Sequence, residues 1–135
     1  PMHWDASPNA GFTTGKPWIG VNPNYKEINA EDEMKDPNSV FNYYKKLIHL
    51  RKTNKIMAYG EYEEYYPEDE HLFVYTRKWE GKMLFVALNW TTEVQQLKIP
   101  DGVDLSGAKL FISNYENTDK VPTQLRGYEA IVYIK

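Results

Sequence analysis

The chain has 135 residues, a formal net charge of −3, no cysteine and an aromatic content of 15%. The slightly acidic balance argues against nucleic-acid or anionic-membrane partners, because both need a concentrated basic surface. The lack of cysteine excludes disulfides and thiolate metal sites and is compatible with a reducing cytoplasm, where we expect the protein to reside.

Residues 1–36 show neither helical nor strand periodicity. They nevertheless contain two of the four tryptophans, Trp4 and Trp18, together with four prolines. A disordered linker would be poor in aromatic residues. We therefore expect an ordered loop that lies on another surface.

A helix is predicted over about residues 37–53. Asp36 suits the N-cap, and Pro37 suits the first helical position. Asn54 is a plausible residue just beyond the C-terminus. Val40, Phe41, Tyr44, Leu47, Ile48 and Arg51 recur at three- and four-residue spacing, and the first five of them form an apolar stripe.

From Lys55 onward the periodicity changes to two, which indicates strands. Leu72, Val74 and Thr76 fall on one face, Phe73 and Tyr75 on the other, and Glu80-Gly81 is typical of a hairpin turn. The predicted strands are 61–66, 71–79, 82–90, 94–99, 109–114, 124–125 and 130–134. The expected fold is mainly β: an antiparallel β-sandwich preceded by a long ordered loop and one α-helix.

Several short motifs occur in a fixed order along the chain. They are Pro1-Met2-His3-Trp4-Asp5, Asn9-Ala10-Gly11-Phe12-Thr13-Thr14-Gly15, Pro17-Trp18-Ile19, Val21-Asn22-Pro23-Asn24-Tyr25, Tyr43-Tyr44-Lys45-Lys46-Leu47-Ile48, Leu50-Arg51-Lys52, Leu125-Arg126 and Tyr128-Glu129-Ala130. Together they resemble the C-terminal end of glycoside hydrolase family 13 α-glucosidases, a group with oligo-1,6-glucosidases, dextran glucosidases, trehalose synthases and sucrose isomerases. Two positions depart from that pattern: His3 stands where the family usually has Gln, and Gly127 where it often has Pro.

The resemblance implies that residues 1–54 are the end of a (β/α)8 barrel and residues 55–135 a C-terminal β-sandwich domain. Such enzymes are retaining, and retention needs two carboxyl groups about 5 Å apart across the glycosidic bond. In the family these carboxylates lie upstream of the segment that this chain resembles. We therefore expect no catalytic, cofactor-binding or metal-binding residue here, and we expect the parent's own barrel as the partner.

Candidate site residues can also be weighed directly. Met2, His3, Trp4 and Asp5 could line a sugar site, but packing of the loop is the more ordinary role of such residues. His49 and His71 have no plausible triad partner in the sequence. The acidic residues do not match a calcium loop and are expected to form a solvated surface and sheet edge; they are Glu31, Asp32, Glu33, Asp36, Glu61, Glu63, Glu64, Glu68, Asp69 and Glu70.

Three further features keep alternatives open. Asn89-Trp90-Thr91 matches a glycosylation acceptor, at a predicted strand end. Aromatic side chains on strands could form a platform for sugar rings, as in a carbohydrate-binding module, or could fill the core: Tyr62, Tyr65, Tyr66, Tyr75, Trp79 and Trp90. The apolar helix stripe, if uncovered in this chain, favours a homodimer.

Overall fold

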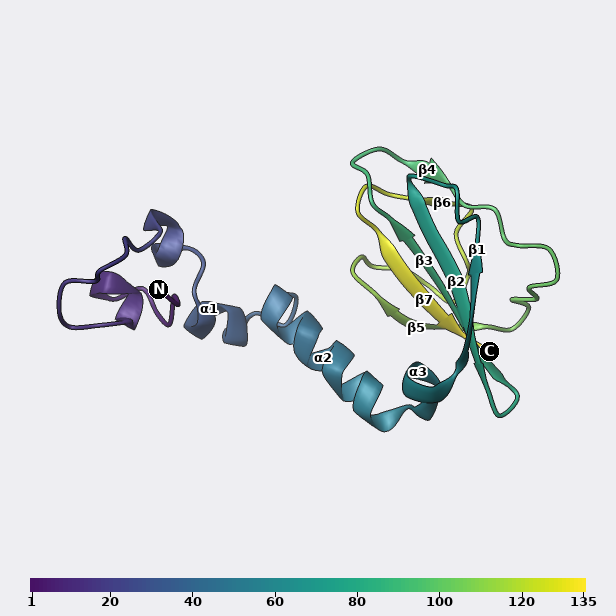
Figure 1. The fold of residues 1–135 in the computed structure, drawn as a ribbon, viewed down its shortest axis with the longest axis horizontal. Helices are drawn as coiled ribbons and strands as arrows, with labels where there is room; N and C mark the ends of the chain where they lie inside the picture. Colours follow the sequence, from purple (N-terminus) through teal and green to yellow (C-terminus); the bar gives the residue numbers. More distant parts are fainter. The chain divides into compact units, whose positions relative to one another are not determined.

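The computed structural model describes all residues from 1 to 135, and they form two compact units, residues 1–50 and residues 51–135 (Figure 1). The first unit contains two 3-10 turns, η1 (Pro8–Gly11) and η2 (Pro23–Lys26), and the short helix α1 (Ala30–Lys35). The helix α2 (Val40–Thr53) continues across the boundary between the units. The loop expected over residues 1–36 is thus ordered by short turns and a helix of its own.

Helix α1 was not predicted, because six residues are too few to show a periodic pattern. Its start is fixed locally: the Asn29 side chain accepts a hydrogen bond from the backbone N–H of Asp32 at 3.0 Å. Lys35 forms an ion pair with Glu31 one turn earlier, at 3.0 Å.

Helix α2 begins at Val40, three residues later than predicted. The hydroxyl of Ser39 accepts a hydrogen bond from the backbone N–H of Asn42 at 3.2 Å, so Ser39 occupies the capping position. Asp36 instead accepts from the backbone N–H of Asn38 at 2.8 Å and closes the turn before the helix. Asn54 precedes a third helix, α3 (Lys55–Tyr59), which was also not predicted.

Antiparallel strands form most of the second unit. A five-stranded sheet has the order β1-β2-β3-β7-β5, and a separate two-stranded sheet pairs β4 with β6. The strands are β1 (Glu61–Tyr65), β2 (Leu72–Trp79), β3 (Lys82–Asn89), β4 (Gln95–Gln96), β5 (Lys109–Ser113), β6 (Gln124–Leu125) and β7 (Ala130–Ile134). The predicted mainly-β antiparallel fold is confirmed.

The β2–β3 hairpin has a two-residue turn, since Trp79 pairs with Lys82. Both turn residues have positive φ, +49° at Glu80 and +76° at Gly81. This is the conformation whose twist matches that of the flanking strands. The sequence predicted this element correctly.

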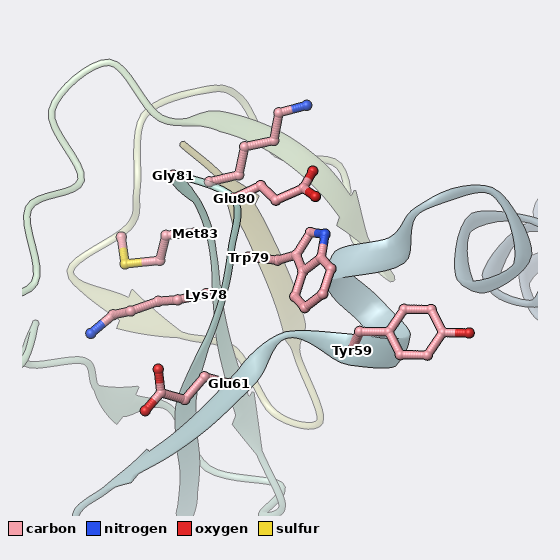
Figure 2. A pocket seen from close by; sticks show the side chains of 8 residues that line it. Tyr59, Glu61, Lys78, Trp79, Glu80, Gly81 and Met83 are labelled. Atoms are coloured by element: carbon pink, nitrogen blue, oxygen red, sulfur yellow. The ribbon is translucent and has the colours of Figure 1, made fainter.

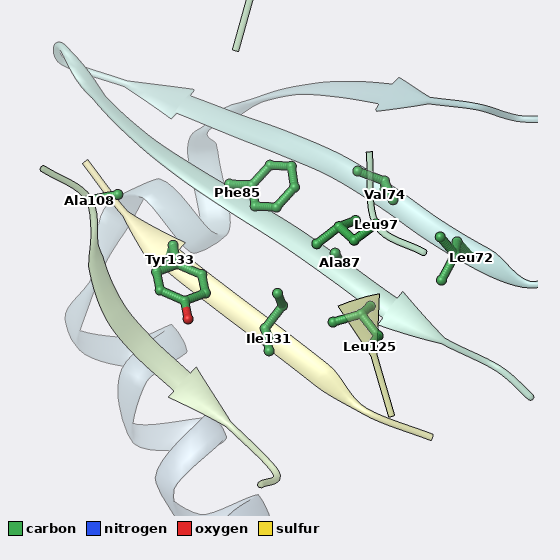
Figure 3. Close-up of a cluster of buried hydrophobic side chains, with 9 residues drawn as sticks. All are labelled: Leu72, Val74, Phe85, Ala87, Leu97, Ala108, Leu125, Ile131 and Tyr133. Atoms are coloured by element: carbon green, nitrogen blue, oxygen red, sulfur yellow. The ribbon is translucent and has the colours of Figure 1, made fainter. Parts of the chain in front are cut away.

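The core lies between one face of the large sheet and the β4–β6 layer (Figure 3). Leu72, Val74 and Thr76 of β2 are buried on this face, as their alternation predicted. The opposing layer contributes two buried leucines, Leu97 and Leu125. Phe85 and Tyr133 are the largest fully buried side chains.

The second layer is smaller than the expected strand over residues 94–99. Only Gln95 and Gln96 pair as a strand, and a further backbone bond joins the N–H of Leu97 to the carbonyl of Thr123 at 2.8 Å. Because β6 offers just two residues as a pairing partner, the rest of the segment packs by side chains such as Ile99. No helix of the structure is both long and apolar enough to span a bilayer.

Candidate functional site

The residues considered for a sugar site, Met2 to Asp5, lie in a segment held by two others. The N–H groups of Trp4 and Asp5 both donate to the carbonyl of Ala10, at 2.9 and 3.4 Å. On the other side, the carbonyls of His3 and Trp4 accept from the first residues of α1, each at 2.9 Å. The side chains of Met2 and Trp4 remain 50% and 53% exposed. The segment is therefore fixed by its backbone while its large side chains stay uncovered.

A left-handed turn supports this segment. Asn9, Ala10 and Gly11 have φ values of +57°, +58° and +64°. A side chain at Gly11 would collide with Asp5, because a Cβ would lie 2.5 Å from its Oδ2. The Ser7 hydroxyl and backbone N–H donate to Asp5 and hold the pKa of its carboxyl below the usual range. Asp5 therefore acts here as a structural carboxylate of the loop.

The three histidines lie in separate elements. His3 contacts the carbonyl of Ile28 through Nδ1 at 3.1 Å, and its ring meets that of Tyr25 edge-on at 6.2 Å. His49 lies in α2, and His71 immediately precedes β2. The structure contains no group of three or more His, Cys, Asp or Glu side chains that could hold a metal ion.

Helix α2 presents an uncovered apolar face, formed by Val40, Phe41, Tyr44 and Ile48, whose residues are 66%, 42%, 62% and 53% exposed. No residue of this helix is buried. The face borders a cavity of about 530 Å³ that includes Met2 and Ile28 from the N-terminal loop. The predicted apolar stripe exists, and no other part of residues 1–50 covers it.

The six candidate platform aromatics are divided among three places. Tyr65 and Tyr66 pack against the core. A row of rings follows the opposite face of the sheet: Tyr62 and Phe73 each lie 5.2 Å from Tyr75, and Trp90 lies 6.5 Å from Phe73. Their planes are tilted by 34° to 48°, so the row is not a flat platform. Phe73 was not among the predicted members.

The remaining aromatic residue, Trp79, lies at the tip of the β2–β3 hairpin. Its ring centroid is 5.9 Å from that of Tyr59 in α3, with the planes tilted by 41°. Figure 2 shows both rings projecting to the same side of the hairpin, with the Glu80 side chain beside the indole. These residues line a cavity of about 530 Å³, together with Glu61, Lys78, Gly81, Lys82 and Met83. We refer to this cavity as the Trp79 pocket.

A second, smaller cavity of about 230 Å³ shares Trp79 as a wall. It is lined by Thr53, Asn54, Lys55, Ile56, Trp79, Glu80, Lys82 and Ile134. The indole Nε1 of Trp79 is buried and has no hydrogen-bond partner. Sequence reasoning could not find this arrangement, since Tyr59 belongs to a helix that the sequence did not predict.

The glycosylation match at Asn89 is not accessible. The side chain is 3% exposed, and its Nδ2 donates to the carbonyls of Glu93 and Arg126 at 2.7 and 2.9 Å. Its Oδ1 accepts from the backbone N–H and hydroxyl of Thr91. Asn89 therefore joins three loop segments and is not available as a glycan acceptor in the folded chain.

The predicted acidic surface is present on the edge strand β1, whose residues Glu61, Glu63 and Glu64 are exposed. Glu63 forms an ion pair with Lys78 of β2 at 2.9 Å. Tyr62 donates to Glu64 at 2.7 Å, and this bond raises the pKa of Tyr62 to about 12. Exposed charges on an edge strand discourage pairing with other chains.

Comparison with known proteins identifies the chain's relatives. Residues 1–60 match the family model "Alpha amylase, catalytic domain". The oligo-1,6-glucosidase of Parageobacillus thermoglucosidasius is 46% identical over 98% of this chain and 24% of its own length.

Solved structures agree with this relationship. The trehalose-6-phosphate hydrolase of Bacillus licheniformis matches 99% of the chain with a TM-score of 0.91 and 39% identity. The trehalulose synthase MutB matches all of it with a TM-score of 0.88 and 34% identity. The chain spans about a quarter of the length of each of these proteins.

Proposed function

The chain is related over its whole length to enzymes of glycoside hydrolase family 13, and on this premise we propose that it is the C-terminal part of an α-glucosidase of the oligo-1,6-glucosidase type. The observation that carries the proposal is the 46% identity with an oligo-1,6-glucosidase, which extends over 98% of the chain. The parent enzyme would hydrolyse α-glucosidic bonds of short oligosaccharides in the cytoplasm.

The chain itself would be non-catalytic in this proposal. Retaining hydrolysis needs two carboxyl groups about 5 Å apart across the bond, and the proposal assigns these groups to the remaining three quarters of the parent. The uncovered face of α2, with Val40, Tyr44 and Ile48, supports a partner that supplies a matching apolar surface. We propose the parent's catalytic barrel as that partner, with the β-sheet unit as a stabilising cover.

The alternative is that the chain is the C-terminal part of an isomerase or synthase, since trehalulose synthase shares the fold of this segment. Its identity of 34% is lower than the 46% found for an oligo-1,6-glucosidase. The hydrolase is therefore the better-supported parent.

Activity assays on a longer protein that includes this segment test the proposal. We expect release of glucose from isomaltose, little or none from trehalose 6-phosphate, and no conversion of sucrose to an isomer. The 135-residue chain alone serves as the control and should release no glucose. A longer protein without activity on any α-glucoside, or glucose release by the chain alone, would contradict the proposal.

A further inference from the structure

We propose that the Trp79 pocket binds a neutral saccharide, at a site formed entirely by residues 51–135. The strongest observation is the pair of rings of Tyr59 and Trp79, which line this cavity with their centroids 5.9 Å apart. The structure thus places two aromatic rings in the wall of one cavity.

The aromatic part of the pocket fits a sugar ring. Tyr59 and Trp79 lie 5.9 Å apart and project to the same side of the hairpin (Figure 2). Tyr59 is 67% exposed, which leaves a ring face open to a ligand. The electron-rich faces of aromatic rings attract the polarised C–H groups of a pyranose, while hydroxyl groups at the ring edge stay free for hydrogen bonds.

The charged side chains of the pocket specify a neutral ligand. Glu61 and Glu80 are balanced by Lys78 and Lys82 in the larger cavity, so no net charge selects an anion or a cation. Carboxylates accept and ammonium groups donate hydrogen bonds, and sugar hydroxyls can satisfy both. The volume of about 530 Å³ is within the range of small-molecule sites.

The backbone of the pocket is held by the hairpin and by α3. Trp79 and Lys82 pair across the turn and therefore project from the same face of the sheet. Arg77, two residues before Trp79, donates to the carbonyls of Ile56 and Gly60, at 3.3 and 2.9 Å, and so fixes α3 against the hairpin. The two rings come from these two elements, so the backbone positions that carry them are fixed by the fold.

Titration of the whole 135-residue chain with isomaltose tests the site, by following the four tryptophan indole N–H signals in ¹H–¹⁵N spectra. The choice of isomaltose rests on the proposed function, but binding does not require catalysis, so a failed glucosidase assay leaves this test intact. We expect a saturable shift of the Trp79 signal, assigned with Trp79→Phe, with half-saturation at about 1 mM. The Trp90 signal should not move.

Two variants separate the pocket from general effects. Glu80→Asn keeps a residue suited to the positive φ of the turn while removing the carboxylate, and we expect about tenfold weaker binding. Trp90→Phe, on the aromatic row outside the pocket, should bind isomaltose as the unmodified chain does. The proposal is overturned if the Trp79 signal does not shift at saturating sugar, if all four indoles shift alike, or if glucose 6-phosphate binds more tightly than glucose.

Discussion

Glu129 is a buried carboxylate that depends on its hydrogen bonds. It is 2% exposed, and Arg126 donates to it through Nη2 and Nε at 2.7 and 2.9 Å, while Asn117 donates at 2.6 Å. Burial alone would raise the pKa of Glu129, but the hydrogen bonds from Arg126 and Asn117 outweigh it and hold the pKa below the ordinary 4.5. The ring of Tyr115 lies 4.2 Å from the guanidinium and completes the cluster.

Glu129→Gln should lower the free energy of unfolding by about 2 to 3 kcal/mol at pH 7, because charge-assisted bonds are lost. A carboxyl whose pKa is lower in the folded state than in the unfolded state stabilises the fold at pH values above its unfolded pKa. This stabilisation is lost as the pH falls through the folded-state pKa. The difference between the two proteins should therefore shrink below about pH 4.5. Urea unfolding at several pH values measures the difference in free energy of unfolding. The variant Glu70→Gln, at an exposed carboxylate, is the control. An equal loss of stability in both variants would contradict the prediction.

Gly127 is required for close packing. A Cβ at this position would lie 2.3 Å from the carbonyl oxygen of Thr92, a backbone atom that cannot rotate away. Gly127→Ala should therefore destabilise the fold by about 1 to 3 kcal/mol, as measured by urea unfolding. A Cβ at Gly20 would meet no atom within 4 Å, so Gly20→Ala should leave stability nearly unchanged. A neutral Gly127→Ala would show that the backbone around Thr92 can move.

At the scale of elements, prediction succeeded where local chemistry alone decides. The hairpin of β2 and β3 is encoded by the alternation of side chains along its strands and by its turn residues. Helix α2 is encoded by its own apolar stripe. Helices α1 and α3 were not predicted, because six and five residues are too few to show a periodic pattern. The extent of β4 depends on how far β6 runs alongside it, which is a long-range property. The Trp79 pocket was not predicted because it also depends on long-range contacts: it brings α3 together with a hairpin about 20 residues further along the chain.

The uncovered face of α2 leads to a prediction about association. Because Tyr44 and Ile48 are 62% and 53% exposed, the isolated chain should associate through this helix as its concentration rises. Ile48→Lys should return the chain to a monomer without loss of helix. Lys46→Gln is the control, because Lys46 lies about 200° around the helix from Ile48, and this variant should still associate. Light scattering and circular dichroism provide the measurement, and a monodisperse unmodified monomer at high concentration would contradict the expectation.

At the scale of the whole molecule, the two units differ in how much apolar surface they bury. Ala10 is the only buried hydrophobic residue among residues 1–50, whereas the second unit holds a continuous core that includes Phe85, Ile131 and Tyr133. Burial of apolar surface is the main favourable term in folding. The first unit is therefore held mostly by hydrogen bonds of its turns and helices, such as those between residues 3–5, Ala10 and α1.

Hydrogen exchange should reveal this difference directly. Amides of residues 1–50 should exchange through local opening, far faster than those of β2, β3 and β7, which open only with global unfolding. In a longer protein in which a barrel covers α2, the amides of Val40 to Leu50 should gain protection, while those of β3 should change little. Equal protection of α2 in the isolated chain and in the longer protein would mean that the exposed face is not an interface, and would remove the physical argument for the barrel as its partner.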